Sequence, residues 1–401
     1  MSVWLPEEII TGEILCWLPA RPLLRFRSVC KHWRSVIDSP DFIQRTIRNS
    51  AATTWSPARD IFLLARQVSY SIPYSAGLLR RHTSPQSLPQ WRSDGGITLL
   101  GSCHGLVCLG YTGTNRVYLL NPATRKHHST LQAPLPQGFM ARFHEPGGQA
   151  TAWWQPFAYG FGYDPGIKDY KLARVYITGD ESHARCKSVV FCFGISSNTL
   201  RAAEIPFCGM IEQRSGVSVG DSLHWPFRMR YGENSIIVAY HLGANQWRGI
   251  PLPREGFGHE VAFNVVGLRN RLCVCNRAAG RDELGKKVVH VWMMRRDQYG
   301  VEAAWSKLFS IRESGYLDLS SLPVALDLSV NGDEVLLYLD GGMLVWYDTK
   351  KERPGQVVYL DGGRLVSVDM ETNYVPIKHL VGRMGFDAIA CFGGVVRPDG
   401  N

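Results

Sequence analysis

Two close pairs of residues, Cys273-x-Cys275 and His127-His128, are the groups in this sequence best suited to metal binding. Cysteines two positions apart lie on one face of a strand, where two thiolates can ligate zinc. However, no Cys-x-x-Cys pair occurs, and no other residues complete a set of four ligands by their spacing. We therefore expect no metal and no cofactor, and we interpret most of the ten cysteines as small core residues of a reduced protein.

The sequence gives equally little support for catalysis. It contains no phosphate loop and no His-Glu-x-x-His zinc-protease motif. Asp94-Gly95-Gly96 and Leu339-Asp340-Gly341-Gly342 are typical of tight turns rather than of phosphate sites. We expect a protein that is not an enzyme.

Aromatic side chains gather at two places where they could anchor a protein partner. These candidate target-binding residues are Trp153, Trp154, Trp225 and Phe227. Tryptophan in particular is favoured at the centre of protein interfaces. The alternative for each ring is packing between sheets inside the fold.

Composition limits where the protein works and what it binds. Of the 401 residues, 45% are hydrophobic and 20% are charged, which allows a large core and more than one domain. The net charge is +9, but the basic residues are scattered, so a nucleic-acid partner is not expected. Glu7, Glu8 and Glu13 interrupt the first apolar stretch, so we expect no signal peptide there, and no apolar run is long enough to span a membrane. We expect a location in the nucleus, the cytoplasm or both.

Residues 1–48 are predicted to form three or four short helices. The first helix carries an apolar stripe at helical spacing: Ile10, Ile14, Trp17 and Leu18. Three more apolar residues lie off this stripe: Ile9, Leu15 and Cys16. A helix that is apolar on more than one side must bury its second apolar face as well, and so small a domain has few other residues that could bury it. We therefore expect a partner to cover part of this surface.

After residue 95 the pattern changes to short apolar strands joined by turns. Segments that close each unit recur at steps of about fifty residues, for example at Leu120-Asn121-Pro122 and Tyr347-Asp348-Thr349. That period, with several strands in each unit, predicts the blades of a β-propeller, and we expect about six. The fold class is thus α+β multidomain: a helical domain at 1–48, a connection at 49–95 with the first strand or strands and a flexible basic loop, and an all-β propeller at 96–398.

The first forty-odd residues resemble the F-box. The resemblance rests on four segments in the same order and spacing: Leu-Pro-x-Glu from Leu5, Ile-Leu-x-x-Leu-Pro from Ile14, Leu-Leu-Arg-Phe-Arg from Leu23 and Val-Cys-Lys-x-Trp-Arg from Val29. The later repeats resemble the F-box-associated, kelch-like region of plant F-box proteins, through GSCHGLVCL, YLLNPATRK and YGFGYDPGIKDYKLARV.

These resemblances imply a substrate-recognition subunit of a Skp-cullin-F-box ubiquitin ligase. The F-box would bind the Skp-type adaptor, and through it the cullin and RING subunits, while the propeller would bind a target protein for ubiquitination and proteasomal degradation. Carried over by position, the adaptor-binding residues are Leu5, Pro6, Ile9, Ile14, Leu15, Leu18, Leu23, Leu24, Val29, Cys30 and Trp33. Some of these must also hold the helices together, and the sequence does not separate the two roles. Four basic residues would lie near the rim and steer association with an acidic adaptor: Arg25, Arg27, Lys31 and Arg34.

Two alternatives remain open from sequence. The chain could be an F-box scaffold that binds the adaptor without degradation, or a propeller enzyme or glycan-binding protein, including a copper oxidase with Tyr, Cys and His ligands. The identity of the target and the propeller face that binds it are not readable from the sequence.

Overall fold

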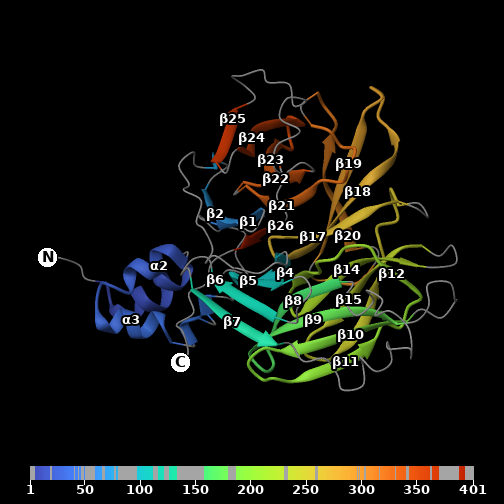
Figure 1. Cartoon of the computed structure of the whole chain (residues 1–401). Helices are drawn as coiled ribbons and strands as arrows, with labels where there is room; N and C mark the ends of the chain where they lie inside the picture. The colour runs from blue at the N-terminus through green and yellow to red at the C-terminus, as the bar shows by residue number, and fades with distance from the viewer. Residues whose placement is uncertain are drawn as a thin grey trace.

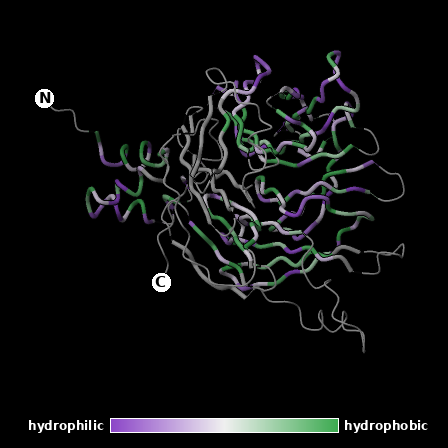
Figure 2. The backbone as a smooth tube through the Cα atoms, turned by 45° about the horizontal axis from the view of Figure 1, so that its top comes forward, coloured by the Kyte–Doolittle hydropathy of each residue, from purple (hydrophilic) through white to green (hydrophobic). Residues whose placement is uncertain are grey.

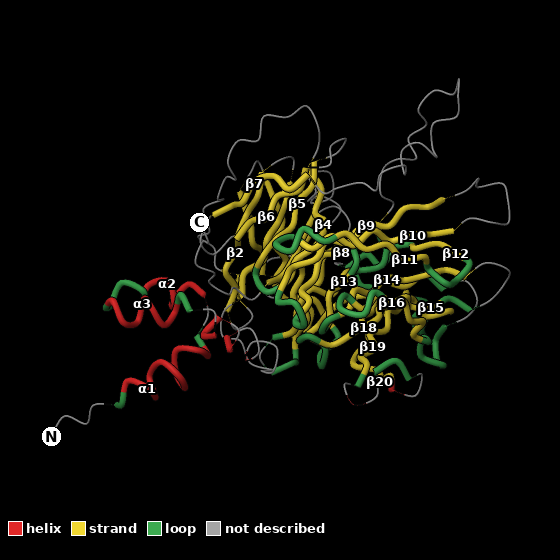
Figure 3. Tube along the Cα trace, turned by 90° about the horizontal axis from the view of Figure 1, so that it is seen from below, coloured by secondary structure: helices red, strands yellow, loops and turns green. Residues whose placement is uncertain are grey.

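The computed structural model divides the chain into a small helical domain and a larger all-β domain beside it (Figure 1). The structure describes residues 5–18, 20–39, 41–43, 45–46, 49, 59–65, 68–75, 78–79, 97–111, 116–121, 126–132, 158–178, 187–229, 234–257, 261–295, 297, 299–301, 304–315, 317–329, 331–339, 343–361, 364–369 and 388–392. Figure 3 shows the helices apart from the strands.

The helical domain begins with one mixed helix and continues with two short α-helices. The first is built of α1 (Glu7–Ile9), the π-helical turn η1 (Ile10–Ile14) and the 3-10 turn η2 (Leu15–Trp17). The other two are α2 (Ala20–Phe26) and α3 (Lys31–Ile37), and residues 41–43 and 45–46 are helical as well. Glu7 and Glu8 lie in the first turn, where carboxylates are favourable at the positive end of the helix dipole.

Six antiparallel sheets form the β domain in the described part of the chain, and we call them blades 1 to 6. Blade 1 contains β26 (Ala388–Phe392), β1 (Arg59–Ala65), β2 (Val68–Ser75) and β3 (Leu78–Leu79), in that order. Blade 2 contains β4 (Ile97–Cys103), β5 (Leu106–Tyr111), β6 (Arg116–Asn121) and β7 (Lys126–Gln132). Blade 3 contains β8 (Ala158–Asp164), β9 (Asp169–Thr178), β10 (Lys187–Gly194) and β11 (Leu200–Glu204).

Blades 4 to 6 follow the same plan with small additions. In blade 4, β12 (Gly209–Ile211) and β13 (Val217–Val219) share one side of β14 (Ser222–Met229), followed by β15 (Ile236–His241) and β16 (Gln246–Ile250). Blade 5 contains β17 (Phe263–Leu268), β18 (Arg271–Arg281), β19 (Lys287–Met294) and β20 (Trp305–Arg312). Blade 6 has five strands: β21 (Val324–Leu328), β22 (Glu334–Leu339), β23 (Met343–Asp348), β24 (Arg353–Asp361) and β25 (Arg364–Asp369).

The six blades form a closed ring. Neighbouring blades touch through their inner strands, from β4 to β8, on to β13 and β14, then to β17 and β21. The ring closes because β26, from the end of the chain, pairs with β1 and touches both β4 and β21. Ring closure covers the faces of every blade and leaves only short, protected strand edges. The predicted propeller is therefore confirmed, and the six sheets agree with the expected blade count.

The core lies between blades, not at one centre. One cluster joins blades 5 and 6 through Val289, Val291, Val335, Leu337 and Val345, each fully buried, and similar clusters join blades 2 and 3, 3 and 4, and 4 and 5. Because both faces of a blade are covered, inner strands are apolar at nearly every position. Figure 2 shows hydrophobic residues along these strands and in the helical domain.

The segment expected to connect the two domains contributes strands to the ring. β1, β2 and β3 lie within residues 49–95 and build three of the four strands of blade 1. The basic loop expected at the end of that segment lies outside the described residues.

Candidate functional site

The helical domain has a small core of its own. One packed cluster contains five side chains, each at most 6% exposed: Leu15, Cys16, Leu23, Ile37 and Phe42. Six more pack against them while partly buried: Ile10, Leu18, Leu24, Phe26, Trp33 and Val36. The helices therefore hold together without help from the propeller.

A second set of large apolar side chains in this domain points to solvent. We call it the outer apolar set, and its members are Leu5 (53% exposed), Ile9 (42%), Ile14 (41%), Trp17 (47%) and Val29 (60%). In the described part of the much larger propeller, four large apolar residues are as exposed: Ile167, Leu284, Val301 and Leu308. Exposed apolar residues concentrated in so small a domain indicate a binding surface, since single ones elsewhere are ordinary.

A π-helical turn decides which residues of the first helix face outward. The backbone N–H of Leu15 donates to the carbonyl of Ile10, five residues earlier. Leu15 therefore lies over Ile10 against the core, and Ile14, which an α-helix would place there, is exposed. The predicted stripe of Ile10, Ile14, Trp17 and Leu18 is thus wrong in its second and third members. Trp17 was absent from the predicted binding residues, and only this turn reveals its exposure.

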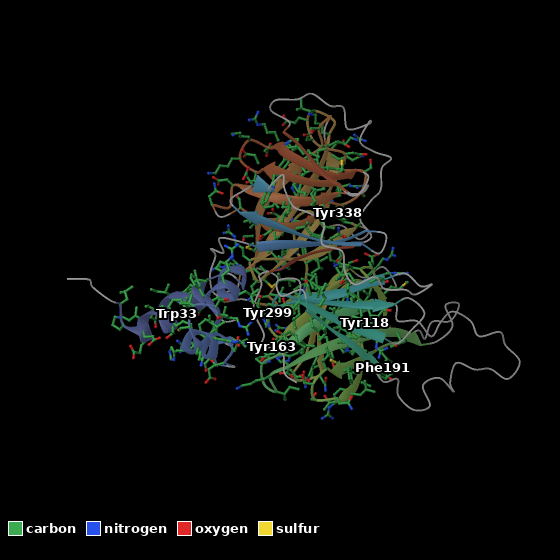
Figure 4. The ribbon with its side chains drawn as sticks, turned by 60° about the vertical axis from the view of Figure 1, so that its left-hand side comes forward. Trp33, Tyr118, Tyr163, Phe191, Tyr299 and Tyr338 are labelled. Carbon is green, nitrogen blue, oxygen red and sulfur yellow. The ribbon has the colours of Figure 1, made fainter. Side chains whose placement is uncertain are left out.

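The third helix is anchored by its own cap and by a ring contact. The Cys30 thiol accepts a hydrogen bond from the backbone N–H of Trp33 at 3.3 Å, as an N-cap side chain does. The Trp33 ring packs edge-on against Phe26, with centroids 5.6 Å apart. Trp33 is thus partly used in holding α2 to α3 (Figure 4).

Charges on this domain divide into one internal pair and three exposed groups. The Arg27 guanidinium grips the Asp38 carboxylate with two contacts of 2.7 Å, and both side chains are about three-quarters buried. Arg25, Lys31 and Arg34 are exposed. Arg27, expected at the rim, therefore braces the domain instead, while a steering role of the other three stays a prediction.

The structure divides the eleven predicted adaptor-binding residues into three groups. Leu5, Pro6, Ile9, Ile14, Val29 and Cys30 are exposed, and Leu18, Leu24 and Trp33 are partly buried. Leu15 and Leu23 are 2% and 1% exposed, so they cannot meet a partner unless the core opens. Their place in the predicted surface is corrected here: these two leucines are core residues.

The propeller residues predicted to bind a target are not available as expected. Trp225 and Phe227 lie on β14 and are fully buried between blades 3 and 4. The Trp225 indole donates to the carbonyl of Tyr159 in the neighbouring blade at 3.0 Å, so this ring is a packing element. Trp153 and Trp154 lie outside the described residues.

The sequence contains one hydrolase-like pattern. Gly216-Val-Ser218-Val-Gly220 matches Gly-x-Ser-x-Gly, which in hydrolases forms a strained turn between a strand and a helix. Here Ser218 lies within strand β13, its hydroxyl donates to the Cys103 thiol at 3.8 Å, and a β-strand follows. The imidazole of His224 is occupied by the Val217 carbonyl and by Tyr299. The pattern does not form a nucleophile site.

The two candidate metal pairs lie on strands of different blades. Cys273 and Cys275 are fully buried on β18, and burial raises the pKa of the Cys275 thiol to about 12, which keeps it protonated at neutral pH. His127 and His128 lie next to each other on β7. No three His, Cys, Asp or Glu side chains come together as a metal site within the described residues. The described helices are also too short and too polar to cross a membrane.

Comparison with known families places both domains. Residues 4–45 match the F-box domain, and residues 70–381 match the F-box associated beta propeller domain. A helical domain with its own core and an outer apolar set, followed by a closed ring of blades, defines a binding protein of the F-box class. The chain belongs to the family of plant F-box proteins that carry the F-box associated propeller.

Relatives in Arabidopsis thaliana match this chain along most of their length. The F-box protein CPR1 is 25% identical over 369 residues, which cover 87% of this chain and 83% of that protein. The F-box/kelch-repeat protein At3g23880 is 24% identical, covering 77% of this chain and 79% of that protein. Among solved structures, a chain of a nidogen/laminin complex matches with a TM-score of 0.43 and 8% identity, over 83% of this chain and 98% of that one.

Proposed function

We propose that this protein is the substrate-recognition subunit of a Skp-cullin-F-box ubiquitin ligase. The helical domain binds the Skp-type adaptor, which links it to the cullin and RING subunits. The propeller binds a target protein and holds it for ubiquitination and degradation. The protein itself is not a catalyst, because its contribution is to raise the effective concentration of the target beside the transferring enzyme.

The outer apolar set is the observation that carries this proposal. The helical domain already has a complete small core, so these five side chains are not needed for folding. Apolar groups left in water at this density are stabilised when a partner covers them. The family membership of both domains supports a Skp-type adaptor as that partner.

The decisive experiment measures adaptor binding and target fate together. The purified full chain is tested for binding to a purified Skp-type adaptor, with a variant of Ile9 and Ile14 to serine as the comparison. Both forms are then expressed in plant cells, and proteins that accumulate only with the variant are followed for their half-life. Adaptor binding with a shortened target half-life supports the ligase role. Adaptor binding without any change in target half-life favours the non-degradative scaffold, and no binding by the folded wild type contradicts the proposal.

The choice of positions matters for this test. Leu23 and Trp33 are poor targets, because one is in the core and the other braces α2 against α3. Their loss would unfold the domain and remove binding for a trivial reason. The proposal also places the protein in the nucleus, the cytoplasm or both, which imaging of a fluorescent fusion tests directly.

A further inference from the structure

The segment 159–171, which carries the resemblance to the propeller family, lies where blade 3 meets blade 4. The Tyr159 backbone N–H donates to the Arg214 carbonyl at 2.7 Å, and the Gly216 N–H donates back to the Tyr159 carbonyl at 2.6 Å. The Trp225 indole donates to the same carbonyl. The two blades therefore share backbone hydrogen bonds in addition to their apolar contact.

Two glycines in this segment allow blade 4 to come close. A Cβ at Gly160 would lie 2.7 Å from Trp225 Cζ2, and one at Gly162 would lie 2.7 Å from Leu242 Cδ1. Real carbon atoms do not approach so closely, so a larger residue at either position would force side chains of blade 4 to shift. The glycines of the family motif are thus required by the neighbouring blade rather than by the strand itself.

A buried ion pair completes the junction. The Lys171 ammonium lies 2.7 Å from the Asp164 carboxylate and donates to the Leu242 carbonyl of blade 4 at 2.6 Å. The two charged side chains are only 8% and 4% exposed. Burial by itself would raise the pKa of Asp164, but hydrogen bonds from Lys171 and from the Gly166 N–H hold that pKa below its usual value.

A second carboxylate ties a third turn to the same place. Asp169 accepts hydrogen bonds from the backbone N–H groups of Ser196 and Ser197, each at 2.9 Å. The turns at 165–168, 195–199 and 242–245 are therefore connected through Asp164, Asp169 and Lys171. In the view of Figure 4, Tyr163, next to Asp164, lies toward the helical domain.

A buried ion pair is a poor choice if stability is all that is required. The free-energy cost of removing two charges from water cancels much of the gain from their attraction. Apolar residues of similar size at the same positions often give a fold of equal stability. What an apolar pair cannot do is direct a hydrogen bond to one carbonyl of the next blade. Lys171 does this at Leu242, so its contribution is geometric.

We propose that segment 159–171 is a rigid seam that joins blades 3 and 4 into one body, with Lys171 as the positioning residue that fixes the turn at 242–245. The motif is a structural joint and not a target-binding element. The seam holds the turns on this side of the propeller in place, so that a bound target keeps a fixed distance from the helical domain. That last consequence rests on the proposed function, whereas the seam itself does not.

The test compares three variants of the full chain. Lys171→Met leaves Asp164 buried without its cation, and Lys171→Met/Asp164→Asn removes both charges while an amide oxygen can still accept from the Gly166 N–H. Lys350→Met is the matched control, because Lys350 forms an equally short pair with Asp333, at 2.7 Å, but is 71% exposed. Thermal unfolding gives the Tm, and hydrogen exchange follows the amides of residues 242–245, which are bonded to Asp221 and His241.

The single variant is expected to lower Tm by about 5–10 °C. The double variant should recover most of that Tm, yet exchange about tenfold faster at 242–245. The Lys350 control should change neither. Wild-type exchange at 242–245 in the double variant would overturn the proposal, even if the single variant does not fold. Adaptor binding is measured on the same samples, and its absence in the wild type would contradict the ligase role while leaving the seam result readable.

Discussion

The outer apolar set makes a quantitative prediction for adaptor binding. We consider the triple variant Ile9→Ser/Ile14→Ser/Val29→Ser, whose native side chains are 42%, 41% and 60% exposed. Burying such a side chain completely stabilises by about 1.5–3 kcal/mol, so the part still in water is worth about 1 kcal/mol at each position. The three together contribute about 3 kcal/mol to binding, which corresponds to a Kd raised roughly 100-fold or more.

The assay is calorimetric titration of the full chain with a purified Skp-type adaptor. Because the three positions are outside the core, the Tm of the variant should stay within about 2 °C of the wild type. The matched control is Ile167→Ser/Leu284→Ser, which replaces propeller residues that are 53% and 76% exposed, and its Kd should not change. A triple variant that binds within about threefold of the wild type would refute the assignment of this surface. An equal loss in the control would show that exposed apolar area in general, and not this set, controls the affinity.

Four further predictions concern the folded state. Leu23→Ala truncates a core side chain that is 1% exposed, so it should destabilise the helical domain by about 2–5 kcal/mol. Adaptor binding and the helical circular dichroism signal should be lost together. Adaptor binding at the wild-type level would contradict this prediction. His224 should make the propeller sensitive to acid, because burial lowers its pKa from 6.5 to about 4 and the unfolded chain therefore takes up a proton that the folded chain refuses. The stability that this group contributes is complete above pH 6.5 and is lost as the pH falls towards 4. The loss is about 3 kcal/mol, at 1.36 kcal/mol for each pKa unit. Urea unfolding at pH 7 and pH 4.5 should therefore show a smaller drop in the free energy of unfolding for His224→Gln than for the wild type. Gly160→Ala should cost about 1–3 kcal/mol by overpacking, whereas Gly280→Ala, which has no atom within 4 Å of the added carbon, should be close to neutral in the same unfolding assay. Truncation of the chain before Ala388 deletes β26 and opens the ring. Limited proteolysis should then cut the propeller faster, while adaptor binding persists. An unchanged digestion pattern would argue against closure of the ring by this strand.

Local patterns were enough to predict the kinds of elements and their order. Helical spacing in the first forty-odd residues and a repeat of about fifty residues afterwards depend on neighbours along the chain. The F-box and propeller assignments rest on such patterns, and the family comparisons confirm them. The same patterns predicted a binding surface on the helical domain, because a domain of that size holds more apolar side chains than it can bury.

Which residue occupies which side of an element depended on the tertiary structure. The π turn at Ile10–Ile14 moves Leu15 into the core and Ile14 and Trp17 out of it, and a regular i, i+4 pattern cannot show this. Trp225 was a plausible anchor by its chemistry but is buried against Tyr159 of another blade. The first error came from a change in helical register at the π turn. The second came from a contact with a distant blade. Neither is visible in the local sequence.

Local periodicity and a family motif therefore specify a helical F-box followed by a propeller, and both can be read along the chain. How the ring closes and what its most recognisable motif does depend on contacts between distant segments. The pairing of β1 with β26 joins strands more than 300 residues apart, and the hydrogen bond from Lys171 to Leu242 crosses 71 residues. Contacts of such long separation form when the blades pack against one another, so their partners are set by the completed ring.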